Sequence, residues 1–299
     1  MEQQYLSELS SILQEEDRVT RNSVTRSKFG STIDCKNINT DFPLMTTKRV
    51  FWRGVVEELL WFLRGNTDAN LLQEKGVGIW NGNSTQEFIQ KCGLKYSPGD
   101  CGPIYGFQWR HYGAKYVNCK TDYTGQGIDQ LKNCIKTILT DPSSRRIIMT
   151  AYNLEQIPEM VLPPCHVTYQ FYVTKGKLNC FLYQRSGDMF LGVPFNLAST
   201  ALLTTIIAHY TGLVPGDIRL SICDAHVYSN HVEAVKKQLE RTPSKLPTVV
   251  IEDDTTGLIT DNVDESVDLI INRIESLTFD KIKLTNYNQQ SAIKAKMIP

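Results

Sequence analysis

The chain has 299 residues, of which 32 are basic, 32 are acidic and 41% are hydrophobic. This length allows one large domain or two small ones with a sizeable buried core. A formal net charge of zero, without a block of like charges, argues against a nucleic-acid binder that acts through counterion release. It argues equally against a protein of anionic membrane surfaces. Small molecules are therefore the expected partners.

Apolar runs and cysteines indicate the cellular context. The longest apolar runs, 59–63 and 201–208, fall short of the roughly 20 residues that a bilayer span needs. Residues 1–16 are acidic and amphipathic, unlike a signal peptide. The eight cysteines are widely spaced and lack zinc or redox motifs, so we expect reduced thiols and no metal site. These features predict a cytoplasmic protein without membrane contact and are also compatible with the nucleus.

In chain order, the periodicity of apolar residues predicts secondary structure as follows. Helices are expected at 2–15, 49–64, 128–139, 197–211, 225–240 and 266–273, and strands at 146–152, 166–173 and 178–184. Gly65 has the position of a helix C-cap, residues 175–177 suit a hairpin turn, and 252–264 reads as an acidic surface loop. Without a repeat or linker, the chain is predicted to be one α+β domain over 1–299, with helices flanking a mixed or antiparallel sheet.

Two adjacent carboxylates in the 49–64 helix have different surroundings on a helical wheel. Glu57 lies one turn after Arg53 and is expected to pair with it on a solvated face. Glu58 falls between Phe51 and Phe62 on an apolar stripe. Burial would raise the pKa of Glu58 and suit it to proton transfer, whereas a position at the edge of the stripe would let it reach water.

Cys165 follows two prolines at a loop-to-strand junction, where a thiol can be exposed yet held in place. As a nucleophile it would need cationic neighbours, and Arg145, Arg146 and Arg185 are candidates. The alternative is a small structural hydrophobe. Sequence alone does not bring the arginines close, so both readings stay open at this point.

Several longer motifs carry a resemblance. They are FPLMTTKR at 42–49, ELLW at 58–61, GPIYGFQWR at 102–110, SRRII at 144–148, LPPCH at 162–166, QRSGDM at 184–189, LGVPFN at 191–196 and DAHVYSNH at 224–231. In this order they resemble the thymidylate synthase family over nearly the whole chain. The resemblance implies the family's α+β fold, in which the large sheets of two subunits pack back to back in a homodimer.

The resemblance also implies a reaction. It is the reductive methylation of dUMP to dTMP, in which 5,10-methylenetetrahydrofolate donates both the one-carbon unit and the hydride and leaves as dihydrofolate. Cys165 would add to C6 of uracil, making C5 nucleophilic enough to attack the folate carbon. The implied catalytic residues are Cys165, Glu58, Tyr105, His166, Asp188 and Asn196. No metal takes part.

For dUMP, the family resemblance implies a phosphate site with arginine forks, a base-reading amide and a ribose site. The implied residues are Arg21, Arg145, Arg146, Gln184, Arg185, Ser186, Asp188, Asn196, His226 and Tyr228. Arg145 and Arg146 match the pair that reaches into the partner subunit's site. The segment 17–25 departs from the family pattern, and its spacing to Phe29 favours Arg21 over Arg18.

For folate, the implied residues are Ile79, Trp80, Asn83, Asp188, Leu191, Gly192, Phe195 and Met297, the last in a C-terminal lid that ends in Ile298 and Pro299. Two other functions compete. A dCMP hydroxymethylase of the same fold carries an acid at the position of Asn196, and asparagine favours uracil over cytosine. A noncatalytic binding protein, such as a regulator of messenger RNA, fits the neutral charge poorly.

Overall fold

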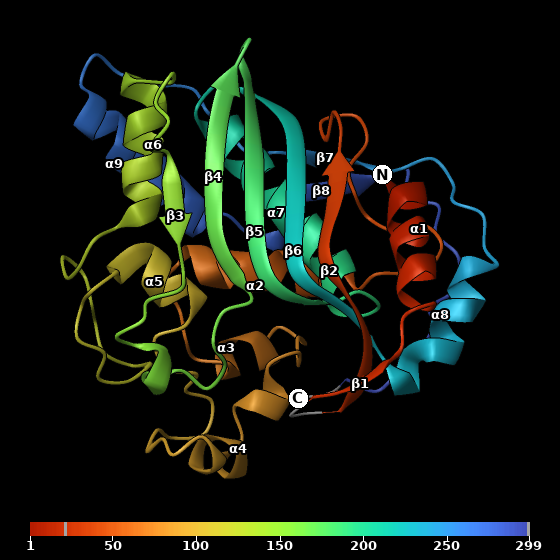
Figure 1. The fold of residues 1–299 in the computed structure, drawn as a ribbon. Helices are drawn as coiled ribbons and strands as arrows, with labels where there is room; N and C mark the ends of the chain where they lie inside the picture. The colour runs from red at the N-terminus through yellow and green to blue at the C-terminus, as the bar shows by residue number, and fades with distance from the viewer. Residues whose placement is uncertain (21–22, 298–299) are drawn as a thin grey trace. The chain divides into compact units, whose positions relative to one another are not determined.

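The computed structural model describes residues 1–20 and 23–297 (Figure 1). The chain folds into two compact units. The first unit comprises Met1–Phe51, Thr174–Glu252 and Ile282–Pro299, and the second comprises Trp52–Val173 and Asp253–Lys281. Both units are therefore built from segments that are distant in sequence.

The first unit contains a mixed sheet. Its strands lie in the order β1 (Asp17–Val19), β2 (Val24–Cys35), β6 (Val214–Tyr228) and β5 (Lys177–Asp188). The pairs β1–β2 and β2–β6 are antiparallel, whereas β5 and β6 are parallel. A separate antiparallel pair joins β7 (Thr248–Ile251) to β8 (Ile282–Thr285).

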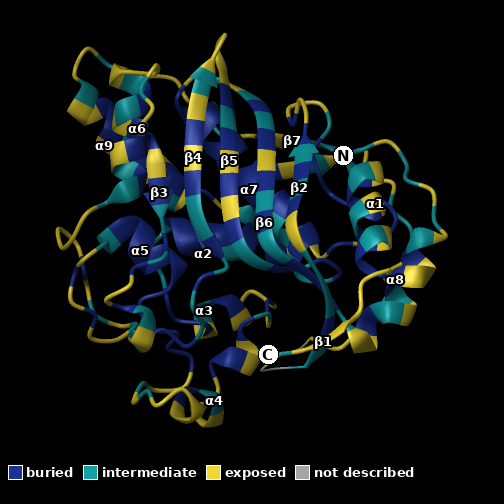
Figure 2. Cartoon of the chain, viewed as in Figure 1, coloured by how far each residue is buried: buried dark blue, intermediate teal, exposed yellow. Residues whose placement is uncertain are grey.

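One face of this sheet forms the core of the first unit. Along β5 the even positions from Leu178 to Gln184 are buried, and the alternating pattern is visible in Figure 2. They align with buried residues of β6 and β2, such as Leu220 and Ile33. The helix α7 (Gly192–Tyr210) packs on β5 and β6 and is apolar on nearly all sides, as a fully enclosed helix must be. Helices α1 (Glu2–Ile12) and α8 (Val232–Leu239) contact each other, and α1 also contacts β2 and β6.

The second unit is mainly helical. It contains α2 (Trp52–Leu63), α3 (Asn70–Gln73), α4 (Gln86–Lys91), α5 (Tyr105–His111), α6 (Gln130–Thr140) and α9 (Val263–Ser276). The strand β3 (Ile148–Thr150) pairs antiparallel with β4 (His166–Thr174).

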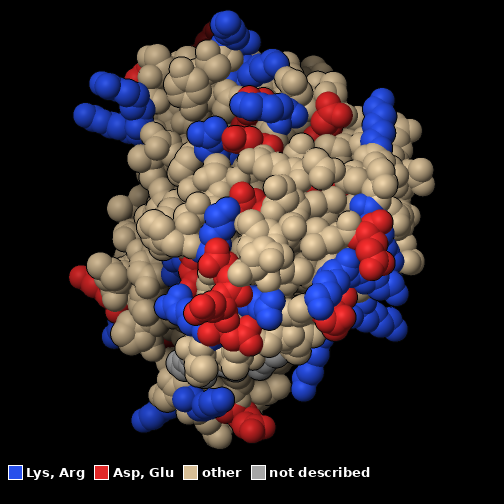
Figure 3. Space-filling model, turned by 45° about the vertical axis from the view of Figure 1, so that its right-hand side comes forward, with Lys and Arg blue, Asp and Glu red and all other residues tan. Residues whose placement is uncertain are grey.

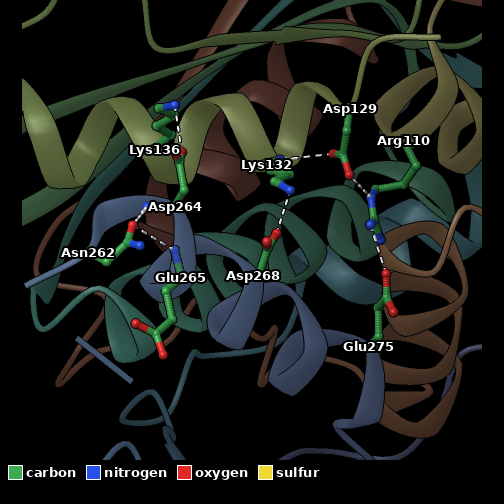
Figure 4. A network of polar contacts seen from close by, with 9 residues as sticks. All are labelled: Arg110, Asp129, Lys132, Lys136, Asn262, Asp264, Glu265, Asp268 and Glu275. Carbon is green, nitrogen blue, oxygen red and sulfur yellow. Dashed lines mark hydrogen bonds and ion pairs between the residues drawn. The ribbon is translucent and has the colours of Figure 1, made fainter. Parts of the chain in front are cut away.

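A network of ion pairs joins these helices (Figure 4). The buried guanidinium of Arg110 lies 2.9 Å from Asp129 at the start of α6 and 2.7 Å from Glu275 in α9. It also donates to the carbonyl of Leu63 at the end of α2. Arg110 thus links the start of α6 to the ends of α2 and α9 through charge-assisted hydrogen bonds.

The predicted fold class, α+β with a mixed sheet and flanking helices, is confirmed. Two predicted elements are confirmed within a few residues, the helix at 49–64 and the strand at 166–173. The predicted turn at 175–177 is also confirmed, with positive φ angles of 49° and 70° at Lys175 and Gly176. Gly65 ends α2 with φ 72°, and its N–H and that of Asn66 bond to carbonyls of the last turn.

Other predictions need correction. The helix expected at 225–240 is wrong over its first part, because 225–228 belong to β6 and α8 begins only at Val232. The strands β2, β6, β7 and β8 were not predicted. Glu57 does lie 3.6 Å from Arg53, but the predicted solvated face is wrong, since the Glu57 side chain is 4% exposed and also binds Lys75. Among the described helices none is both long and apolar enough to cross a bilayer.

Candidate functional site

Glu58, which is partly buried, pairs with the buried Trp80 in the second unit. The indole Nε1 of Trp80 donates to Oε1 of Glu58 at 2.7 Å. Burial raises the pKa of Glu58 to about 7, and the bond from Trp80 opposes this shift only in part. Glu58 is only partly buried, so the alternative of an edge position that reaches water stays open. A carboxyl group with this pKa exchanges protons readily at neutral pH.

Cys165 directly precedes β4, and its backbone is hydrogen-bonded to a side chain of α5. Its N–H donates to the hydroxyl oxygen of Tyr105 at 2.8 Å. The ring of Tyr105 lies 5.5 Å from that of His166, whose Nδ1 is 3.0 Å from the hydroxyl of Tyr169. Three of the predicted catalytic residues, Tyr105, Cys165 and His166, thus lie together in the second unit.

Cys165 is less buried than Cys35, Cys101 and Cys134, whereas Cys119 is partly buried, as Cys165 is. Burial is the main cause that raises the pKa of Cys35 and Cys101 far above the ordinary value, and that of Cys119 and Cys134 to about 12. These four stay protonated and unreactive at neutral pH. Cys165 is only partly buried, so its position is compatible with access to a substrate.

The remaining predicted residues of the second unit differ in exposure. Ile79 is partly buried, and Asn83 is 7% exposed with an amide nitrogen that has no hydrogen-bond partner among the described residues. Such a buried donor is available to a ligand. Arg145 and Arg146 are exposed between α6 and β3, where their side chains reach solvent.

In the first unit, Gln184 holds Asn196. The amide nitrogen of Gln184, in β5, donates to Oδ1 of Asn196 at 3.0 Å and to the carbonyl of Ser186. Asn196 lies in the second turn of α7, which begins at Gly192. The bond from Gln184 fixes which end of the Asn196 amide is the acceptor. Arg185 and Ser186 follow on the same strand, both partly buried.

Asp188 ends β5 and shapes the loop before α7. Its Oδ1 accepts hydrogen bonds from the N–H groups of Phe190 and Leu191 at 2.9 and 3.2 Å. Leu191, Gly192 and Phe195 follow at the start of α7 and are partly buried. This arrangement places a carboxylate and three folate candidates on one short segment.

The ribose candidates lie at the end of β6. His226 is buried, with Nδ1 3.1 Å from Asp224, and its ring lies 5.1 Å from that of Tyr228. Arg18 lies 3.4 Å from the same Asp224, whereas Arg21 lies outside the described residues. The Met297 side chain is 52% exposed, and Ile298 and Pro299 also lie outside the described residues.

Sequence analysis gave no role to Lys48, which the structure places beside the Asp188 loop. The buried Lys48 ammonium donates to the carbonyl of Phe190 and lies 3.6 Å from the centroid of the Phe190 ring. Burial lowers the pKa of Lys48 to about 7. Its place in the FPLMTTKR motif at 42–49 was the signal available. Within the described parts of the chain, no cluster of His, Cys, Asp and Glu could hold a metal ion.

Comparisons with known proteins agree with the motifs. The family model described as thymidylate synthase matches residues 3–299. The chain is 48% identical to thymidylate synthase of Herpesvirus ateles, over 99% of this chain and 97% of the relative. It is 59% identical to that of equine herpesvirus 2, over 70% and 73% of the two chains. With human thymidylate synthase the identity is 52%, over 84% and 80%.

Proposed function

The chain belongs to the thymidylate synthase family, and from this premise we propose a role in the family reaction for each residue described above. The reaction is the reductive methylation of dUMP to dTMP by 5,10-methylenetetrahydrofolate, with dihydrofolate as second product. It runs through a covalent bond between a cysteine and C6 of uracil. The folate is a co-substrate that supplies both carbon and hydride.

Cys165 is the nucleophile. The observation that carries this role is the fixed backbone of Cys165, bonded to Tyr105 at 2.8 Å, together with a thiol outside the deeply buried group. Addition to C6 places negative charge on C5 and O4, and C5 then attacks the folate carbon. Tyr105 and His166 belong to the network that moves the C5 proton.

Glu58 relays protons toward O4 and the folate nitrogen. With a pKa of about 7, it is present in both protonation states at neutral pH, which suits an acid that later acts as a base. The indole N–H of Trp80 donates to the Glu58 carboxyl oxygen, and the Trp80 ring contacts the folate. Ile79 and the unpartnered amide of Asn83 complete this part of the folate contacts.

Asn196 reads the base. Its Oδ1 already accepts from Gln184, and an amide oxygen can accept a second bond from N3–H of uracil. Its amide nitrogen then donates to O4. Cytosine presents the opposite pattern, an unprotonated N3 and an amino group, so this orientation favours dUMP over dCMP.

The phosphate, the ribose and the folate are contacted by different residues. Arg185, Ser186 and Gln184 bind or position the phosphate. Arg21 and the partner subunit's Arg145 and Arg146 also contact it. His226 and Tyr228 bind the ribose hydroxyl, and Asp188 contributes to both ligands. Leu191, Gly192, Phe195 and Met297 contact the folate, the last from a tail that excludes water.

A homodimer of single-domain subunits completes the proposal, with Arg145 and Arg146 serving the partner's site. Support comes from β5, whose outward side chains Phe181 and Tyr183 are 42% and 40% exposed. A Phe181→Asp variant should sediment as a monomer. Mixing an inactive Cys165→Ala protein with an inactive Arg146→Ala protein should restore part of the activity, because hybrid dimers then hold one intact site.

Nucleic-acid binding remains secondary in this proposal. On the face drawn in Figure 3, basic and acidic side chains are mixed, which suits the zero net charge of the chain. Messenger RNA binding would be salt-dependent if present. We place the enzyme in the cytoplasm or nucleus.

The test of the proposed nucleophile compares Cys165→Ser with Cys92→Ser, a change at an exposed cysteine. Purified proteins receive dUMP and methylenetetrahydrofolate, and dihydrofolate is followed by absorbance. Cys165→Ser should lose turnover while Cys92→Ser keeps it. Wild-type turnover in the Cys165→Ser protein would refute the role.

A further inference from the structure

His231 joins the C-terminal tail to the body of the first unit. It ends the short helix η3 (Ser229–His231), and its side chain is completely buried. Its Nε2 lies 2.8 Å from the carbonyl oxygen of Lys296, the residue before Met297. Because a carbonyl oxygen only accepts, Nε2 carries a proton and donates to the tail.

The other ring nitrogen faces a carboxylate. The Nδ1 of His231 has no hydrogen-bond partner in the described structure and lies 3.9 Å from Oδ1 of Asp188. This distance is too long for a hydrogen bond but within the range of an ion pair. The two groups therefore act on each other directly.

This geometry determines the protonation of the ring. An unprotonated Nδ1 would point its lone pair at the negative Asp188, whereas a protonated Nδ1 would attract it. The other charged group near His231 is Lys48, which opposes a second proton; the rings of Phe190 and Tyr228 lie 5.6 and 5.5 Å away. Burial lowers the pKa of His231, but Asp188 and the Lys296 carbonyl together raise it above its ordinary value.

We propose that His231 is an imidazolium that couples the C-terminal tail to Asp188, so that closing of the tail and orientation of Asp188 occur together. Oδ1 of Asp188 is held by the Phe190 and Leu191 N–H groups and attracted by His231. The second oxygen is left for a ligand. His231 is a positioning residue in this proposal, which rests on the proposed folate roles of Asp188 and Met297.

The protonation state can be measured without turnover. Protein labelled with ¹⁵N-histidine contains five histidines, and the His231 signals are those that disappear in His231→Gln. Titration of these ring signals should give His231 a midpoint above the ordinary histidine pKa. A midpoint at or below that value in the folded protein would overturn the proposal.

Two variants separate the two contacts. The amide nitrogen of His231→Gln occupies about the place of Nε2 and keeps the bond to Lys296, while that of His231→Asn replaces Nδ1 and loses it. The glutamine variant should keep the wild-type rate of hydrogen exchange at 294–297 and raise KM for methylenetetrahydrofolate about tenfold, the effect of one charge-assisted contact. The asparagine variant should exchange faster at the tail. KM for dUMP, to which Asp188 also contributes, should rise less than KM for the folate in both.

The control is His111→Gln in the second unit, which should change neither readout. Unchanged tail exchange and folate KM in both His231 variants would overturn the coupling. An equal rise of both KM values that parallels a loss of thermal stability would overturn it too, because a merely structural role gives that result. If the wild-type protein fails to turn over dUMP, the proposed function fails, while the histidine spectrum and tail exchange still test His231.

Discussion

The raised pKa of Glu58 predicts that the wild-type carboxylate destabilises the folded protein at neutral and alkaline pH. The shift from 4.5 to about 7 reflects burial of the charged form. Below the unfolded pKa the group is protonated in both states and costs nothing. As the pH rises through the folded pKa, the full cost appears, ~3 kcal/mol for this shift.

Glu58→Gln removes this titration. The difference in unfolding free energy between the variant and wild type should therefore shift by ~3 kcal/mol in favour of the variant from about pH 4.5 to about pH 8. Urea unfolding at these two pH values and one protein concentration measures the change. The variant should also lose turnover, because an amide cannot relay protons.

The neighbouring carboxylate provides a matched control. Glu57→Gln removes the partner of Lys75, 2.8 Å away, and should destabilise the protein at alkaline pH. The two variants thus have opposite signs at about pH 8. If the stability difference between Glu58→Gln and wild type is the same at both pH values, the argument that burial governs Glu58 is refuted.

Three further variants test other parts of the structure. Asn196→Asp should lose dUMP preference and gain turnover of dCMP, as competition between the two nucleotides would reveal; unchanged selectivity removes Asn196 from base reading. Asn262→Ala deletes the N-cap of α9 and should cost about 1 kcal/mol in urea unfolding, and no loss would mean that water replaces the cap. Arg110→Met leaves Asp129 and Glu275 without their partner and should cost about 3 kcal/mol; a neutral effect would mean that these groups find other partners.

Local patterns predicted some parts of the fold well. The apolar stripe of the 49–64 helix and Gly65 were readable because a helix buries every third or fourth residue and glycine tolerates positive φ. The strand β6 was missed because it contains Pro215 and Gly216 and because its later residues also suit a helix start. Its pairing with β2 and β5, which are distant in sequence, outweighs these local preferences.

The sequence motifs indicated more of the candidate site than the physical properties of individual residues did. The helical wheel put Glu58 on the apolar stripe but left open whether it reaches water. It placed Glu57 in solvent, because nothing local reveals that Lys75 covers it. The bond from Gln184 to Asn196 and the contact of His231 with the tail join residues from different elements. Such contacts depend on tertiary structure, so the sequence pattern alone could not predict them.

The central claim is that this chain methylates dUMP with methylenetetrahydrofolate. The most direct measurement gives purified protein the folate with either dUMP or dCMP, follows dihydrofolate by absorbance and identifies the nucleotide product by mass. The account predicts dihydrofolate and dTMP with dUMP alone. Conversion of dCMP to a hydroxymethyl product without dihydrofolate, or no turnover with either nucleotide, would contradict it.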